Sequence, residues 1–339
     1  MRPDASVMPP PQARTEHVPA VWRRPLLRLA LAWLGLMAFA STEWTEMARQ
    51  WWDASTYNHI LLVPFILVWL VWQRWPELER LAPKPWWPGL ATLAGALLVW
   101  RVGAAFGINL VSQLGAVMML QAAVAVLLGP REAAGLLFPL GYMLFLVPFG
   151  DEIVPALQAI TAKLAVALTH LSGVPAQIDG VFIDTPAGLF EVAEACSGVK
   201  FLVAMVALGT LVAHLCFASA KRRVLFMAAA VIVPVLANGV RAWGTIYVAQ
   251  SQGIEFAAGF DHIVYGWIFF ALVMAAVIGG SWRFFDRSPD DPLIDPAAIE
   301  RSPVLAELSR FGIGGWQALA AIALLAAAVV WIDRLTRIA

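Results

Sequence analysis

Charged residues are scarce in this chain. They make up only 14% of the 339 residues, and the formal net charge is zero, whereas a soluble domain carries about 25% charged residues. No basic patch with interleaved aromatic residues is present, so we expect no nucleic-acid partner. Hydrophobic residues account for 60% of the chain, and the mean hydropathy is +0.74. This balance predicts a membrane protein.

Cysteine is nearly absent as well. Cys196 and Cys216 are 20 residues apart, which corresponds to about 30 Å along one continuous helix. A disulfide needs Cα atoms within about 7 Å, so an intramolecular bond is excluded if that helix is unbroken. The sequence also lacks a His-Glu-x-x-His motif, a cysteine cluster, a Gly-x-Ser-x-Gly turn and a phosphate-binding glycine loop. We therefore expect no metal and no cofactor.

What the chain does contain is a series of apolar blocks of about 20 residues, the length that crosses a hydrocarbon core about 30 Å thick. They predict an all-α fold, a polytopic bundle of transmembrane helices. Pro234 and Gly239 are expected to break the seventh helix. We expect about nine spans, at approximately 26–41, 60–72, 86–105, 110–128, 133–148, 193–217, 224–248, 262–282 and 312–332.

The orientation follows from lysine and arginine, which are enriched on the cytoplasmic side of membrane proteins. One consistent arrangement places the N-terminus inside and the C-terminus outside. Arg334 and Arg337 depart from it mildly, and Arg101 must lie near an outer end. The residues that this arrangement places inside are Arg23, Arg24, Arg74, Arg80, Lys84, Arg131, Lys221, Arg222, Arg223, Arg283 and Arg287.

Polar segments between the spans define the domain organisation. Residues 43–59 are typical of an aromatic-rich interfacial loop, and 151–171 of a short amphipathic helix outside the cytoplasm. Residues 180–190 predict a β-hairpin around Pro186-Ala-Gly188. We expect four regions, namely a disordered tail at 1–22, a transmembrane catalytic domain at 23–285, a cytoplasmic Pro/Asp-rich linker at 286–311 and an additional C-terminal span at 312–339.

Three polar residues fall at similar depths in neighbouring predicted spans. Cys196 lies in the first turn of the sixth span, within Glu191-Val-Ala-Glu-Ala-Cys-Ser-Gly-Val-Lys200, and His262 opens the eighth. Arg241 lies about 12 Å from the outer end of the seventh by helical rise. An arginine inside a span costs about 2.5–3.5 kcal/mol and is normally functional or paired. We therefore predict one site, in or beside the outer leaflet.

These residue types favour acyl-transfer chemistry. Cys196 would attack a carbonyl carbon, helped by a helix N-terminus and a guanidinium that lower a thiol pKa. His262 would act as general base and then general acid, and Arg241 would stabilise the oxyanion or orient the substrate. Asn238, one turn before Arg241, would hold its guanidinium or donate another hydrogen bond. The residues assigned supporting or substrate-binding roles are Asn238, Glu194, Ser197, Glu191, Tyr57 and His59.

Each residue also has an ordinary structural interpretation. A free cysteine in an apolar helix is usually a small hydrophobe, and a histidine at a membrane interface often has no further role. Arg241 could pair with Glu191 or Glu194, or extend its guanidinium to water, and Asn238 could serve helix packing. Two alternatives therefore stay open: a transporter or polysaccharide-export component with an anion-binding arginine, and a membrane thiol acyltransferase that uses the same three residues.

The polar motifs carry a family resemblance. Glu194-Ala-Cys-Ser-Gly198 opens one span, Asn238-Gly-Val-Arg241 lies in the next, and His262 followed by Gly266-Trp267 opens a third. Together with the aromatic segment that contains Tyr57 and His59, they resemble the exosortase family, the membrane cysteine enzymes of bacterial protein sorting. The resemblance covers about residues 25–285. Lys200 stands where many members carry arginine.

The resemblance implies cleavage and transpeptidation at a C-terminal sorting signal through a Cys196 thioester. Such a signal has a Pro-Glu-Pro-type (PEP-CTERM) motif, a transmembrane helix and a basic cluster. The implied partners are therefore membrane-anchored proteins in the lipid bilayer, with exopolysaccharide-export machinery as a further candidate. The implied location is the bacterial inner membrane, with the site facing the periplasm. Some members continue past a further span into a periplasmic domain, and the predicted span at 312–332 is similar to the stem of such an extension.

Overall fold

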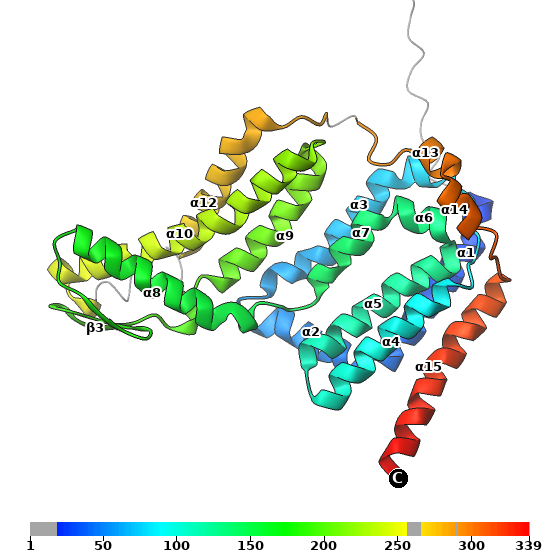
Figure 1. Cartoon of the computed structure of the whole chain (residues 1–339), viewed down its shortest axis with the longest axis horizontal. Coiled ribbons are helices and arrows are strands. Elements are labelled where there is room, and N and C mark those ends of the chain that lie inside the picture. Colours follow the sequence, from blue (N-terminus) through cyan, green and yellow to red (C-terminus); the bar gives the residue numbers. More distant parts are fainter. Residues whose placement is uncertain (1–18, 256–265, 289–290, 339) are drawn as a thin grey trace, which may run out of the picture.

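The computed structural model describes residues 19–255, 266–288 and 291–338, and helices dominate these ranges (Figure 1). Within them, six helical segments are long and apolar enough to cross a membrane, or seven if one sharply bent pair counts as a single span. A small antiparallel sheet lies at one end of the molecule (Figure 1). The chain is therefore a polytopic helical membrane protein, as its composition predicted. The nine-span count stays a prediction.

The N-terminal half packs around α5 (Asn109–Leu128), most of whose residues are buried. Its nearest neighbour is α4 (Gly89–Phe106), and glycine permits the close approach, because a Cβ on Gly103 would overlap the backbone of Ser112. The other elements of this half are α1 (Ala20–Phe39), α2 (Ser41–Asp53), η1 (Asn58–Leu62), α3 (Val63–Leu78), α6 (Pro130–Gly135), α7 (Leu137–Tyr142) and η2 (Met143–Leu146).

Two expectations for this half were wrong. The segment 43–59 is largely helical, because α2 continues to Asp53 after a bend of 85° from α1. The predicted span at 133–148 is divided into α6, α7 and η2. Pro139 has no N–H for the carbonyl four residues back, and its ring clashes with that carbonyl. The helix accordingly stops at Gly135 and restarts at Leu137.

The C-terminal half is built on a helical hairpin. η3 (Asp151–Ile153) leads into α8 (Val154–Leu171), which packs along α10 (Ala220–Gln252). α9 (Val199–Cys216) runs antiparallel to α10, and α12 (Gly266–Ser281) packs on the same helix before η6 (Trp282–Phe284) (Figure 1). Because α8 is itself long and apolar enough to span a membrane, its predicted location outside the membrane stays a prediction.

The predicted hairpin is part of a three-stranded antiparallel sheet, in the order β1 (Gln177–Asp179), β2 (Phe182–Thr185) and β3 (Gly188–Glu191). Phe182 pairs with Glu191 and Thr185 with Gly188, so the expected turn at 186–187 is confirmed. Gly180 makes the turn between β1 and β2 with φ +61°. β3 forms one edge of the sheet and leads directly toward Cys196.

The break predicted in the seventh span is wrong, because α10 is one helix of 33 residues. Its rise of about 1.5 Å per residue makes it about 50 Å long, which exceeds a hydrocarbon core of about 30 Å. Pro234 is buried within this helix, and packing against α8 and α9 offsets the lost hydrogen bond. Gly239 serves close packing instead, since a Cβ there would lie 2.7 Å from the Cβ of Leu164 in α8.

The segment after α12 returns to the N-terminal half. It contains α13 (Pro296–Arg301) and α14 (Pro303–Leu308), whose N-termini are capped by the side chains of Asp295 and Ser302. The backbone N–H groups of Trp87 and Ile313 then donate to the carbonyls of Phe311 and Pro85 at 3.2 and 3.0 Å. α15 (Gly315–Ile338) follows and packs against α1 (Figure 1). The described part of the segment predicted as a linker thus contains two short helices, and its role as a cytoplasmic linker stays a prediction.

Candidate active site

Cys196 lies in a short turn that precedes its helix. The turn is η4 (Glu194–Cys196), and the regular α-helix α9 begins at Val199. The apolar segment that could cross a membrane runs from Glu194 to Cys216, so Cys196 lies at its start, as predicted, in a 3-10 turn. Gly198 separates the two elements with φ +85°, a left-handed conformation that costs other residues about 1–2 kcal/mol. The buried Ser197 hydroxyl accepts a hydrogen bond from the N–H of Val199 at 3.3 Å. The sequence Cys-Ser-Gly therefore directs the chain from the sheet into α9.

Side chains from two helices hold this turn. The Asn238 amide in α10 donates to the carbonyl of Cys196 at 2.9 Å and to the Thr161 hydroxyl at 3.0 Å. In α8, Thr161 donates to the Ser197 carbonyl at 3.5 Å, and Gln158 donates to the Val192 carbonyl at 2.7 Å. Asn238 therefore binds the backbone of the cysteine turn, whereas the sequence had left open a role beside the Arg241 guanidinium.

Cys196 and Arg241 lie at similar distances from the turn between α9 and α10, because these two helices form a hairpin. Cys196 precedes the last residue of α9 by 20 positions, and Arg241 follows the first residue of α10 by 21 positions. Both therefore lie about 30 Å from the connecting turn by helical rise. That turn is flanked by Lys221, Arg222 and Arg223, so the two residues lie at the opposite end of the hairpin from its basic end.

The two residues line one cavity of about 160 Å³ between the sheet and α10. Its wall is mostly apolar, and Glu191 is the acidic residue within it. Lys200, one turn after Cys196, interacts electrostatically with both Cys196 and Arg241. The cavity therefore brings a thiol and a guanidinium together beside an apolar wall, and Lys200 adds a second positive charge nearby. Its lining residues are Ile183, Phe190, Glu191, Val192, Cys196, Arg241, Ala242, Thr245, Ile246 and Ile254.

The family model for transmembrane exosortases matches residues 51–279, which is more than half of the chain. The chain belongs to the transmembrane exosortase family. No curated protein and no solved structure matches it. The matched range contains the sheet, the cysteine turn and the α9–α10 hairpin, while α13, α14 and α15 follow after it.

The third residue predicted for the exosortase site, His262, lies outside the described residues. Glu194 is exposed and, unlike Glu191, does not contribute to the cavity wall that the described residues form. Among the described residues, no group of three histidine, cysteine or carboxylate side chains has an arrangement that would hold a metal ion. The structure thus brings together Cys196, Arg241 and Glu191 from the predicted set.

Tyr57 and His59 lie in the other half of the molecule. Tyr57 is buried, and burial, followed by the nearby carboxylates of Asp151 and Glu152, raises its pKa well above the ordinary value. The His59 ring contacts the carbonyl of Thr56 through Nδ1 at 3.1 Å. Neither side chain contributes to the cavity wall, as far as the described residues define it. Their predicted supporting or substrate-binding role stays a prediction.

Sequence reasoning missed the contribution of α8. Gln158 and Thr161 are two polar residues three positions apart in the mainly apolar first half of α8, so they lie on one face of it. That pattern marks a polar contact inside a membrane protein. It does not identify the partners, which are backbone carbonyls of the segment 192–197.

Proposed function

We propose that this exosortase is a membrane cysteine peptidase and transpeptidase that cleaves C-terminal sorting signals at the outer face of the inner membrane. The observation that carries the proposal is the shared cavity of Cys196 and Arg241, at the end of the hairpin opposite its basic residues. Since basic ends favour the cytoplasm, this cavity would face the periplasm.

The reaction would begin with attack of the Cys196 Sγ on the scissile carbonyl carbon. His262 takes the thiol proton, and the Arg241 guanidinium stabilises the negative charge that develops on the carbonyl oxygen. When the C–N bond breaks, His262 returns the proton to the departing amine, leaving a thioester on Cys196. Water or an acceptor amine then attacks the thioester carbonyl and restores the thiol.

The substrate would be a membrane-anchored protein with a Pro-Glu-Pro-type motif, a transmembrane helix and a basic cluster. An extended motif suits the site, because β3 is an edge strand and two of its residues, Phe190 and Glu191, contribute to the cavity wall. Edge strands bind extended peptides through main-chain hydrogen bonds. The Lys200 and Arg241 cations would favour an acidic residue in the motif.

The two cysteines provide a matched test. In cells that co-express a tagged substrate with such a signal, we expect Cys196→Ala to abolish processing and Cys216→Ala to leave it unchanged. A transporter with an inert cysteine would tolerate both changes, so normal processing by the Cys196→Ala protein would refute the mechanism. Mass spectrometry of the released product separates peptide cleavage from acyl transfer by a lipid-dependent thiol acyltransferase.

A further inference from the structure

A second polar cluster lies at the basic end of the molecule, where the two halves meet. Arg74 in α3 is 1% exposed, and it donates to the Leu70 carbonyl at 2.8 Å and contacts the His214 ring of α9. That ring stacks on Phe138 of α7, with 3.5 Å between ring centroids and 8° between planes. The Nε of Arg74 is buried and has no hydrogen-bond partner within the described residues. His214 therefore joins three helices around a buried guanidinium.

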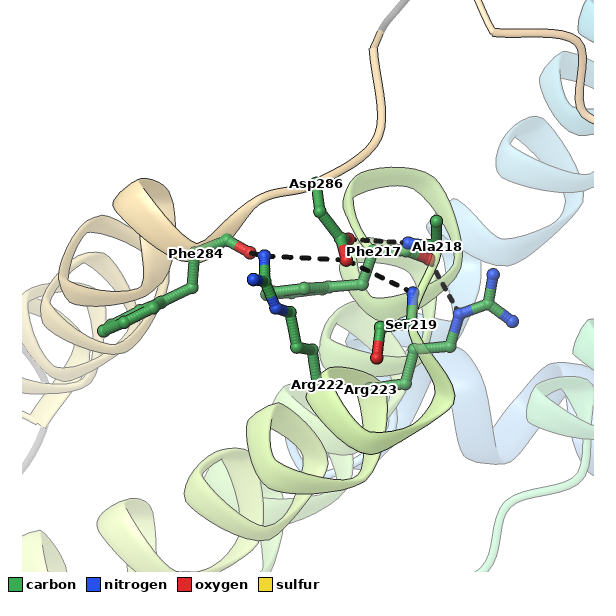
Figure 2. A network of polar contacts seen from close by, with 7 residues as sticks. All are labelled: Phe217, Ala218, Ser219, Arg222, Arg223, Phe284 and Asp286. Atoms are coloured by element: carbon green, nitrogen blue, oxygen red, sulfur yellow. Dashed lines mark hydrogen bonds and ion pairs between the residues drawn. The ribbon is translucent and has the colours of Figure 1, made fainter.

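Two further arginines approach the same histidine. Arg287 donates to the His214 carbonyl at 3.0 Å and to the Pro292 carbonyl at 3.3 Å. Arg223 donates through Nε to the Phe217 carbonyl at 2.8 Å, and Figure 2 shows its guanidinium pointing away from Asp286. Arg74, Arg223 and Arg287 all interact electrostatically with the His214 ring. We call these three residues the arginine cluster.

The cluster carries more positive than negative charge. The Glu77 carboxylate, one turn after Arg74, attracts the Arg74 guanidinium, whereas the positive charge of Arg287 repels that guanidinium. Asp286 is engaged elsewhere, because it accepts from the backbone N–H groups of Ala218 and Ser219 at 2.7 and 3.4 Å and pairs with Arg222 at 3.5 Å (Figure 2). In the described part of the chain, no ion pair joins a carboxylate to any member of the arginine cluster.

Carbonyl hydrogen bonds hold these like charges together, and a guanidinium group binds phosphate oxygens in a planar, two-pronged geometry. We propose that the arginine cluster binds an anionic phosphate group at the junction of the two halves, and that its source is the headgroup of an anionic phospholipid. Basic pockets between transmembrane helices on the cytoplasmic side bind such headgroups.

The surroundings favour a lipid over a soluble phosphate. The cluster lies at the ends of apolar helices, where a bilayer places its headgroups. Large apolar side chains next to it in the sequence are exposed, including Val224 at 68%, Trp282 at 74% and Phe284 at 50%. Tryptophan is enriched at this depth of a membrane. A phospholipid whose phosphate binds the arginine cluster would thus have its acyl chains beside an apolar surface.

The test uses the purified full-length chain in detergent, with added phosphatidylglycerol, phosphatidylcholine or inorganic phosphate. We expect phosphatidylglycerol to raise the melting temperature by several degrees more than phosphatidylcholine, because a ligand that binds only the folded state stabilises it. Arg223→Gln and Arg287→Gln should each weaken phosphatidylglycerol binding roughly fivefold, as measured by native mass spectrometry. Lys221→Gln is the matched control, because it removes an exposed cation from the same helix end.

The outcomes distinguish a phospholipid headgroup from a soluble phosphate, and some of them would overturn the proposal. Stabilisation by inorganic phosphate alone, lost in Arg223→Gln, would support a phosphate site and assign it to a soluble ligand. Equal stabilisation by the two lipids with no effect of phosphate would overturn the proposal. It would also fail if Lys221→Gln weakened binding as much as Arg223→Gln. Should Arg287→Gln not fold, the lipid comparison on the unaltered chain and on Arg223→Gln still decides.

Discussion

The Asn238 side chain donates a hydrogen bond to the backbone carbonyl of Cys196 at 2.9 Å, and so ties the turn before α9 to the middle of α10. The same amide donates to Thr161 in α8 at 3.0 Å. Three elements distant in the sequence therefore meet behind one cysteine. Because Asn238 acts on the main chain, we assign it to positioning the thiol rather than to chemistry.

Replacing Asn238 by leucine should remove both hydrogen bonds while nearly preserving side-chain volume. The Cys196 carbonyl would then lose its partner, which costs about 1–3 kcal/mol for a buried group. We expect a lower melting temperature and slower labelling of Cys196 by a thiol reagent, measured with Cys216 replaced by serine. Thr161→Ser keeps the hydroxyl and should label at the original rate, whereas Thr161→Val should share part of the defect. Unchanged labelling in Asn238→Leu would contradict the positioning role.

Gly198 should tolerate no side chain. Its φ of +85° costs an alanine about 1–2 kcal/mol, and a Cβ there would lie 2.8 Å from the Cγ of Asn238. We therefore expect Gly198→Ala to reduce substrate processing at least tenfold while the protein still inserts into the membrane. Gly244→Ala is the control, because nothing lies within 4 Å of a Cβ at that helical position. Equal activity of the two variants would show that the turn is more adaptable than its geometry indicates.

Sequence analysis predicted the positions of residues along the helices better than the way in which the helices pack side by side. Apolar runs and basic ends predicted most helices, and they also predicted that Cys196 and Arg241 fall at similar depths. Depth did not separate these residues from Tyr57 and His59, which lie in the other half of the molecule. Lateral position depends on which helices pack together, and a hydropathy pattern carries little information about that choice.

The local errors have the same origin. Pro234 and Gly239 are helix breakers by propensity, but packing against α8 and α9 keeps α10 continuous. Near Pro139 the residues are continuously apolar, so the hydropathy pattern did not indicate the interruption between α6 and α7. Gln158 and Thr161 were visible as polar residues, yet their carbonyl partners exist only once the sheet and α8 are in place. Tertiary packing thus decided each case that propensity alone left open.

Arg241 offers a direct test of oxyanion stabilisation. Removing one preorganised donor from such a site typically lowers the turnover rate by about 10²–10³. We expect Arg241→Gln to show a loss of this size in substrate processing, and Arg241→Lys to recover part of it because the charge is retained. The control is Arg310→Gln, which removes an exposed partner of Glu307 and should have little effect, since surface ion pairs contribute about 0–1 kcal/mol. A stability loss in Arg241→Gln without a rate effect would indicate a structural ion pair instead.

Glu132 should make stability depend on pH. It is 2% exposed, its Oε1 has no hydrogen-bond partner among the described residues, and burial raises its pKa from 4.5 to about 7. Between these values the unfolded chain loses a proton that the folded chain keeps, so the unfolded state binds fewer protons. Stability therefore falls as the pH rises from about 4.5 to about 7 and is constant above that.

Glu132→Gln keeps the shape and hydrogen-bonding capacity of the neutral acid but cannot ionise. Its melting temperature should therefore exceed that of the unaltered protein at pH 8, and the difference should shrink toward pH 5, where the native carboxyl is mostly protonated. Thermal melts of both proteins across this pH interval measure the effect. The control is Glu79→Gln, which removes an exposed carboxylate at the C-terminal end of α3, a helix that contacts α6, and it should leave the pH profile unchanged. Parallel profiles for the native protein and Glu132→Gln would show that this carboxyl titrates alike in the folded and unfolded chains.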